Sequence, residues 1–100
     1  MAVTKSYLKG KHILAVDDEK DILDTIADIL EDAKVDRALD YETASRKIKE
    51  GRYDLAILDI MGVNGLKLLE AAVERCIPAV MLTAHAITPE TLMESIRKGA

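Results

Sequence analysis

Phenylalanine and tryptophan are absent from this 100-residue chain, and tyrosine occurs only three times. The hydrophobic core must therefore come from aliphatic side chains, which supply most of the 49% of residues that are apolar. Lys and Arg number 14 against 18 Asp and Glu, and the basic residues do not form a stripe. Direct nucleic-acid binding is therefore not expected, because phosphate recognition needs clustered positive charge. A chain of this length is expected to form one domain over residues 1–100.

Cysteine and long hydrophobic runs are equally scarce. Cys76 is the only cysteine, so no intrachain disulfide can form, which fits a reducing cytoplasm. We interpret it as a partly buried packing residue. Residues 1–11 lack the apolar segment and cleavage site of a signal peptide, and no apolar stretch is long enough to span a bilayer. We therefore expect a cytoplasmic protein without a membrane partner.

Three short apolar runs are present, and each ends in a side chain that carries oxygen. Residues 13–16 lead into Asp17 and Asp18, residues 55–58 stop at Asp59, and residues 79–82 stop at Thr83. Continuous apolar runs of this length are typical of strands buried on both faces of a parallel sheet. The carboxyl ends of such strands share one edge, where ligands of open α/β sheets bind. The pattern therefore predicts that three acids and one hydroxyl converge there.

Strands and helices are expected to alternate along the whole chain. The apolar patterns predict strands at residues 12–16, 35–39, 55–58 and 79–82, and helices at 21–33, 43–50 and 66–75. A fourth helix is expected to start at Thr88, Pro89 and Glu90, with Thr88 as its N-cap. Regular alternation of this kind predicts an α/β fold with a doubly wound parallel sheet and right-handed crossovers.

The three predicted neighbouring carboxylates suit a hard cation. Asp17, Asp18 and Asp59 would repel one another and raise at least one pKa unless a cation lay between them. Mg²⁺ binds few carboxylates and completes its octahedron with water, backbone carbonyls and phosphate oxygens. Asp59 could then act as a nucleophile and form an aspartyl phosphate. Each acid alone could instead cap a helix or lie in a solvated turn, but all three strands would then have to place oxygens at one edge by chance.

These residues resemble the receiver domain of two-component response regulators. The matching blocks are spread along nearly the whole chain: residues 13–19, which include Asp17, Asp18 and Glu19; residues 55–65, from Leu55 through Asp59 to Gly65; residues 78–85, which include Thr83; and residues 98–100. The resemblance implies a flavodoxin-like receiver fold and a signalling module that is not an enzyme, beyond self-phosphorylation from a phosphodonor and slow autodephosphorylation.

The resemblance also implies roles for individual residues. Asp59 would be the phosphoacceptor, Asp18 a direct Mg²⁺ ligand and Asp17 a ligand acting mainly through water. The backbone carbonyl of Met61 would complete the protein ligands, and the hydroxyl of Thr83 would turn toward the phosphoryl group as the switch. The phosphodonor would be a sensor histidine kinase or a phosphotransfer protein.

The chain departs from the pattern of the family in two places. The loop from Asp59 to Gly65 is short, with Gly62 where a proline is usual. The sequence also stops before a fifth strand and fifth helix, so the sheet is expected to have the strand order 2-1-3-4 and to lack the lysine that ends the fifth strand; Lys98 is not that lysine. The fourth strand would then be an apolar edge, and we expect self-association through it, or a parent chain that continues.

Two other functions are open to this sequence. A phosphohydrolase of the haloacid-dehalogenase type would use an Asp nucleophile on a similar sheet, but it places its two acids two positions apart after the first strand. The adjacent Asp17 and Asp18, followed by Lys20, do not fit that spacing. A degenerate receiver acting only as a protein–protein interaction module is the second alternative, favoured by the missing C-terminal element and opposed by the intact acidic set.

Overall fold

The computed structural model describes residues 9–59 and 64–82, together with residues 90 and 94. Seven elements lie within these residues, in the order β1 (His12–Val16), α2 (Lys20–Ile29), β2 (Lys34–Ala38), α3 (Tyr41–Glu50), β3 (Leu55–Asp59), α4 (Gly65–Glu74) and β4 (Ala79–Leu82). The predicted fourth helix, which was to begin at Thr88, lies outside the described residues apart from Glu90 and Glu94.

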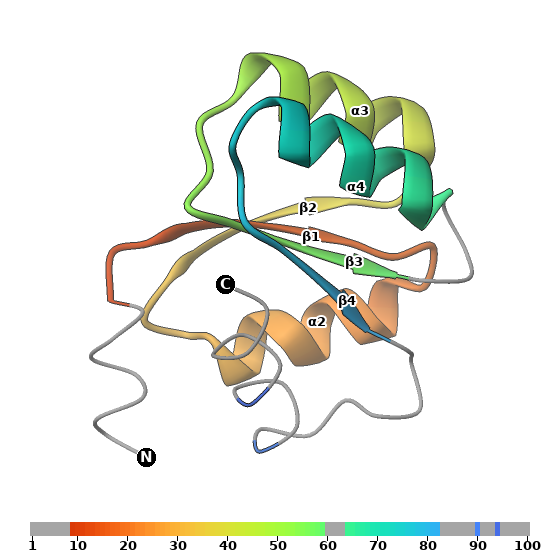
Figure 1. Ribbon diagram of the computed structural model, residues 1–100. Coiled ribbons are helices and arrows are strands. Elements are labelled where there is room, and N and C mark those ends of the chain that lie inside the picture. The colour runs from red at the N-terminus through yellow and green to blue at the C-terminus, as the bar shows by residue number, and fades with distance from the viewer. Residues whose placement is uncertain (1–8, 60–63, 83–89, 91–93, 95–100) are drawn as a thin grey trace.

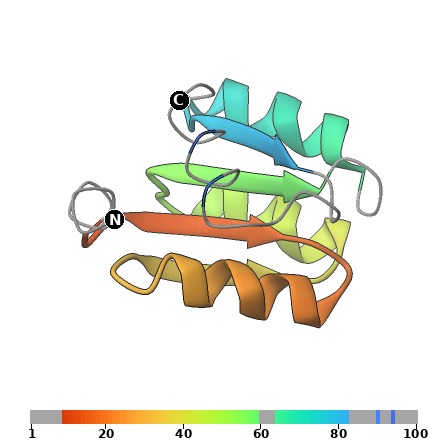
Figure 2. The ribbon, with the colours of Figure 1, turned by 90° about the horizontal axis from the view of Figure 1, so that it is seen from below.

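The four strands form one parallel sheet in the order β2-β1-β3-β4. Helix α2 covers one face of the sheet, whereas α3 and α4 lie side by side on the other (Figure 1). Viewed at right angles to this, the strands point the same way, so their carboxyl ends share one edge (Figure 2). The predicted doubly wound parallel sheet with strand order 2-1-3-4 is confirmed.

Alternation along the central strands divides the core into two layers. Ile13 and Ala15 of β1 pack on the side of α2, whereas Leu14 and Val16 pack on the side of α3 and α4. Strand β3 alternates in the same way, and all of its five residues are buried. Because both faces of these strands are covered, their sequences read as unbroken apolar runs. The same burial holds the carboxyl ends of β1 and β3 in fixed positions.

Helix α2 ends at Ile29, four residues before the predicted end at Ala33. The N–H of Leu30 still bonds to the carbonyl of Ile26, but Leu30 itself has left the helical conformation. Ala33 then closes a turn onto the carbonyl of Leu30, at 2.9 Å, and packs against the α2 side of the core. Its apolar spacing continued the helical pattern in the sequence, although the chain had already turned toward β2.

Helix α3 begins at Tyr41, two residues before the predicted start. Asp40, which lies between the predicted strand 35–39 and the predicted helix 43–50, is the N-cap, and its side chain accepts a 2.7 Å hydrogen bond from the N–H of Thr43. This bond satisfies one of the free donors of the first turn. Strand β2 correspondingly ends at Ala38 and not at Leu39, whose side chain is 49% exposed. Strands β1 and β4 have their predicted bounds.

Candidate functional site

The ends of β1 and β3 bring two of the predicted acids together. Val16 and Leu58 are partners in the parallel register, so the residues that follow them, Asp17 and Asp59, lie next to each other at the edge of the sheet. The N–H of Asp17 also bonds to the carbonyl of Ala38, at 3.1 Å, which extends the pairing with β2 by one step. The backbone at Asp17 and Asp59 is therefore held by the pairing of the strands.

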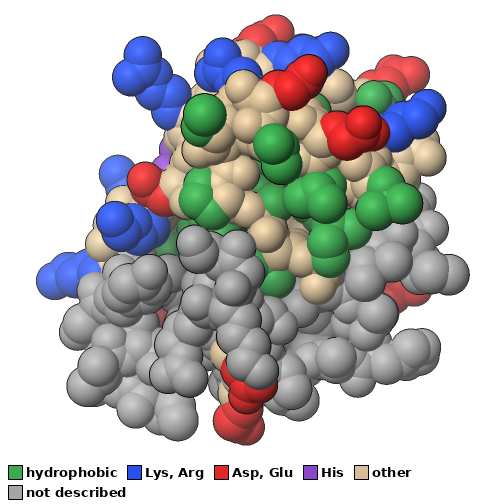
Figure 3. Space-filling model, viewed as in Figure 1, with side chains coloured by type: hydrophobic (Ala, Val, Ile, Leu, Met, Phe, Trp, Pro, Cys, Tyr) green, Lys and Arg blue, Asp and Glu red, His purple; other side chains and the backbone are tan. Residues whose placement is uncertain are grey.

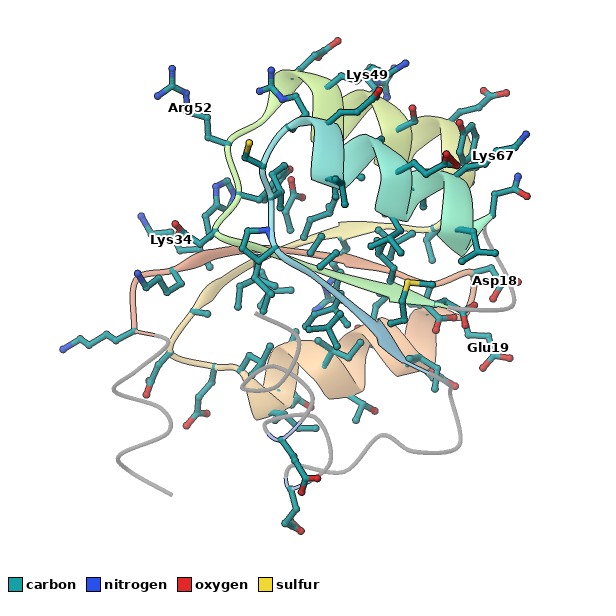
Figure 4. The ribbon with its side chains drawn as sticks, viewed as in Figure 1. Asp18, Glu19, Lys34, Lys49, Arg52 and Lys67 are labelled. Carbon is teal, nitrogen blue, oxygen red and sulfur yellow. The ribbon has the colours of Figure 1, made fainter. Side chains whose placement is uncertain are left out.

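One carboxylate oxygen from each of Asp17, Asp18 and Asp59 lies within 4.8 Å of the other two. Asp17 and Asp59 are buried, at 5% and 8% exposure, whereas Asp18 is exposed. Asp18 and its neighbour Glu19 lie at the end of the sheet where the strands terminate (Figure 4). Lys34 and Arg52 lie at the opposite end of the sheet in the same view (Figure 4).

The turn after β1 is held by the first acid itself. The Oδ1 atom of Asp17 accepts a 2.8 Å hydrogen bond from the N–H of Glu19, the residue that precedes α2. This contact orients the carboxylate, and an ionised carboxylate can still accept further contacts. Asp17 therefore both shapes the turn and contributes to the acidic cluster.

Burial and like charges change the acidity of Asp17. Its pKa is raised to about 6, first because burial disfavours the charged form, and then because Asp59 and Asp18 are close; the N–H of Glu19 opposes the rise. The sequence predicted that crowding would raise at least one pKa at this site. The rise is found, but burial contributes more to it than charge repulsion does.

The cluster fits a small divalent cation by its chemistry. All three side chains offer hard oxygen donors, which Mg²⁺ prefers. One carboxylate oxygen of each acid lies within 4.8 Å of those of the other two, close enough for a single ion to reach all three. A cation would also favour the charged form of the buried Asp17. Asp17, Asp18 and Asp59 could therefore hold Mg²⁺.

Gly65 contributes to the shape of the site, although the sequence indicated it only as the end of the loop after Asp59 and as part of the matching pattern. It is the first residue of α4, is buried, and lies directly against the backbone of Asp59. A Cβ atom at this position would overlap the carbonyl oxygen of Asp59. The sequence could have indicated this role, because Gly65 begins a helix shortly after a strand that ends in Asp59. The close approach of Gly65 to Asp59 depends on tertiary packing, which the sequence does not show.

Two predicted site residues cannot be placed. Met61, whose carbonyl was expected to bind the metal, and Thr83, the expected switch hydroxyl, both lie outside the described residues. Leu82, the residue before Thr83 in the sequence, is the partner of Asp59 in the β3–β4 register. The roles of Met61 and Thr83 stay predictions.

A second polar cluster lies away from the acidic edge and joins β2 to α3. Lys47 donates a 2.7 Å hydrogen bond to Asp36 Oδ1 and a 3.0 Å bond to the carbonyl of Arg37. The hydroxyl of Tyr53 donates to the other oxygen of Asp36, at 2.6 Å, and the ring of Tyr53 lies against that of His12. These contacts tie α3 and the segment that follows it to β2.

The interpretation of Cys76 as a partly buried residue is wrong. Its side chain is exposed, and its backbone has a φ of 59° in the turn between α4 and β4. The neighbouring Ile77 is buried instead. In the part of the chain that the structure describes, no helix is long and apolar enough to cross a membrane.

Comparison with known proteins gives one family. Residues 13–100 match the response regulator receiver domain family. A curated relative, the two-component response regulator ARR18 of Arabidopsis thaliana, is 32% identical over 97 residues, which are 91% of this chain and 15% of that protein. The chain therefore spans a small part of the length of this relative.

Solved structures agree with the family match. A CheY-like response regulator receiver domain protein from Methanospirillum hungatei is 32% identical, with a TM-score of 0.69 over 92% of this chain and 78% of the other. The chemotaxis protein CheY4 of Vibrio cholerae has a TM-score of 0.74 over 91% of this chain and 99% of the other; at 22% identity it supports the fold alone. From the parallel sheet, the acids at its edge and these matches together, the chain belongs to the response regulator receiver domain family.

Proposed function

We propose that this chain is the phosphoacceptor module of a two-component signalling system and receives a phosphoryl group on Asp59. The convergence of Asp17, Asp18 and Asp59 at the carboxyl edge of a receiver fold carries this proposal. Separate roles as helix caps would not require these three side chains to meet. Receiver domains are signalling modules and not classical enzymes, so the chemistry proposed for Asp59 serves a switch.

Mg²⁺ is the cofactor that we propose for the acidic cluster. Asp17, Asp18 and Asp59 would hold it, together with the carbonyl of Met61. When bound, the ion would offset the negative charge that the three carboxylates and a phosphoryl group bring together. Asp17 gives direct support, because its carboxyl group is buried, has a raised pKa and would be favoured in its charged form by a cation.

The proposed transfer is a single displacement at phosphorus. A carboxylate oxygen of Asp59 forms the new O–P bond while the P–N bond of a phosphohistidine on the donor breaks. The imidazole leaves with the bonding electron pair and takes up a proton. The limited exposure of Asp59 and Asp17 keeps most water away from the reacting oxygen, which favours transfer to the carboxylate over loss to solvent.

The donor and the switch complete the proposal. A sensor histidine kinase or a phosphotransfer protein would supply the phosphoryl group, and we propose a cytoplasmic location for the chain on that ground. The hydroxyl of Thr83 would follow the phosphoryl group and pass the change to the surface of the domain. A degenerate receiver that acts only as a protein–protein interaction module is the alternative, and the intact acidic cluster speaks against it.

Phosphorylation from a small phosphodonor tests the proposed function. The purified chain, incubated with acetyl phosphate and Mg²⁺, should gain the mass of one phosphoryl group, and chelation of the metal should abolish the gain. Asp59→Ala should not be labelled, whereas Asp28→Ala, which removes an exposed acid on α2, should be labelled like the parent. A parent protein that stays unlabelled would favour the interaction-only alternative.

A further inference from the structure

The first residue of α4 touches the last residue of β3. A Cβ atom at Gly65 would overlap the carbonyl oxygen of Asp59, lie 3.3 Å from the carbonyl carbon of that residue, and lie 3.0 Å from Cε of Met81. Gly65 has no left-handed backbone conformation that would reserve the position for glycine. The available space, and not the backbone angle, is therefore what excludes a side chain here.

The two neighbours of Gly65 differ in how they could respond to a larger residue. The Cε atom of Met81 is the end of a flexible side chain and can rotate away. The carbonyl of Asp59 belongs to a strand that is paired on both sides, with β1 through Leu58 and with β4 through Asp59 itself. A side chain at position 65 would therefore push directly on the backbone of Asp59.

Helix α4 has little freedom to move away instead. Leu68 and Ala72 are completely buried against the sheet and fix the inner face of the helix. The residue before the helix is tied to its first turn: Asn64 has a φ of 54°, and its carbonyl accepts hydrogen bonds from Lys67 and Leu68, at 3.0 and 3.1 Å. Displacing the start of α4 would disturb these contacts.

From this geometry we propose that Gly65 is a positioning residue for the acceptor carboxylate. By leaving the carbonyl of Asp59 in place, Gly65 holds the Asp59 side chain within reach of Asp17 and Asp18. Relieving the overlap would need a shift on the order of 1 Å, and a displacement of that size at a reacting group is enough to cost about 100-fold in rate. Mg²⁺ is sensitive to the same shift because it demands near-octahedral oxygen geometry. The inference rests on the function proposed above.

A matched pair of glycine variants separates positioning from general packing. Gly51 caps the C-terminal end of α3, and a Cβ there would lie 2.7 Å from the Tyr53 ring and 2.8 Å from the carbonyl of Lys47. Gly65→Ala and Gly51→Ala should therefore both lower the melting temperature. Only Gly65→Ala should weaken Mg²⁺ binding, by tenfold or more, as expected when the support of a metal ligand is lost. Affinity is read from amide chemical shifts during titration with Mg²⁺ alone.

The same variants are then treated with beryllofluoride and Mg²⁺, and the adduct is followed by ¹⁹F NMR. Gly51→Ala should give the resonance of the parent, whereas Gly65→Ala should give a weaker or shifted one. If Gly65→Ala does not fold, Gly65→Ala/Met81→Ala removes the one flexible contact and is measured beside Met81→Ala. Its Mg²⁺ affinity should still be at least tenfold below that of Met81→Ala.

Three results would overturn the positioning role. Parental Mg²⁺ affinity in Gly65→Ala would show that Asp59 tolerates a side chain at this position. Affinity equal to that of Met81→Ala in the double variant would assign the effect to Met81. Failure of both variants to fold, while Gly51→Ala folds, would reduce Gly65 to a packing residue. A parent that binds neither Mg²⁺ nor beryllofluoride would instead overturn the proposed function, and this inference with it.

Discussion

The hydroxyl of Tyr53 donates a 2.6 Å hydrogen bond to Oδ2 of Asp36, and so joins the segment before β3 to the middle of β2. Burial alone would raise the pKa of Asp36, but hydrogen bonds from Lys47 and Tyr53 outweigh it and leave the pKa below its usual value. Burial and the same bond raise the pKa of Tyr53. This cluster holds α3 against the sheet on the face that also carries α4.

Replacing Tyr53 by Phe should destabilise the protein by about 1.5–3 kcal/mol, because the lost bond reaches a charged acceptor that is only partly open to water. Urea unfolding followed by circular dichroism measures the change. Tyr41→Phe is the matched control, since its hydroxyl has no hydrogen-bond partner among the described residues and its ring packs against the same layer of the core. Equal losses in the two variants would show that ring packing, and not the bond to Asp36, explains the effect.

Without metal, the stability of the domain should fall as pH rises through the titration of Asp17. The folded-state pKa of about 6 lies above the ordinary value of 3.8, so the contribution of Asp17 is complete below pH 3.8 and is lost as pH passes 6. One pKa unit corresponds to about 1.4 kcal/mol, and with solvent screening we expect a loss of roughly 2 kcal/mol.

Urea unfolding between pH 4 and 7, with a chelator present, measures this loss of unfolding free energy. Asp17→Asn should remove it, and saturating Mg²⁺ should reverse its sign, because metal binding favours the ionised carboxylate. A metal-free protein whose stability rises steadily over the interval in parent and variant alike would contradict the assignment to Asp17.

Removing the charge of Asp18 should have opposite effects in the two metal states. Asp18→Asn should weaken Mg²⁺ binding, yet raise the melting temperature of the metal-free protein by about 2–4 °C, since Asp18 contributes to the unfavourable environment of Asp17. Calorimetry with chelator and with Mg²⁺ gives both values. A metal-free variant that melts below the metal-free parent would refute the crowding argument.

Exposed apolar side chains on α4 predict that the chain associates with itself. Leu66 and Val73 are 68% and 65% exposed, and Figure 3 shows hydrophobic side chains gathered on this face in the region of α4 and β4. Association through the β4 edge stays a prediction, because the residues that follow Leu82 lie outside the described residues apart from Glu90 and Glu94. Light scattering should show larger species at high micromolar concentration.

The variant Leu66→Gln/Val73→Gln provides the comparison for that measurement. If α4 takes part in the contact, the double variant should scatter less than the parent at every concentration. A parent that remains monomeric across the whole dilution series would show that neither surface drives association.

Local signals in the sequence predicted much of the fold. The apolar runs before Asp17 and Asp59 predicted β1 and β3 correctly. Both strands are buried on both faces, so their sequences are continuously apolar and easy to recognise. The end of α2 was missed, since Ala33 keeps the helical spacing while packing from a turn. The N-cap Asp40 was missed because an aspartate is equally suited to a turn.

The candidate site likewise has features that the sequence predicts and features that it does not. The meeting of Asp17, Asp18 and Asp59 follows from parallel strand ends and could be predicted. The close approach of Gly65 to Asp59 could not, because it depends on how deeply α4 packs. The dominance of burial in the pKa of Asp17 likewise requires the folded environment.

The identity of the phosphorylated residue tests the central claim most directly. The chain is treated with acetyl phosphate and Mg²⁺, the acyl phosphate is reduced with borohydride to homoserine, and the modified residue is located by peptide mass spectrometry. The account requires homoserine at position 59 and at no other acid. Homoserine at position 17 or 18, or its complete absence from a folded, Mg²⁺-loaded protein, would contradict the assignment of Asp59 as the phosphoacceptor.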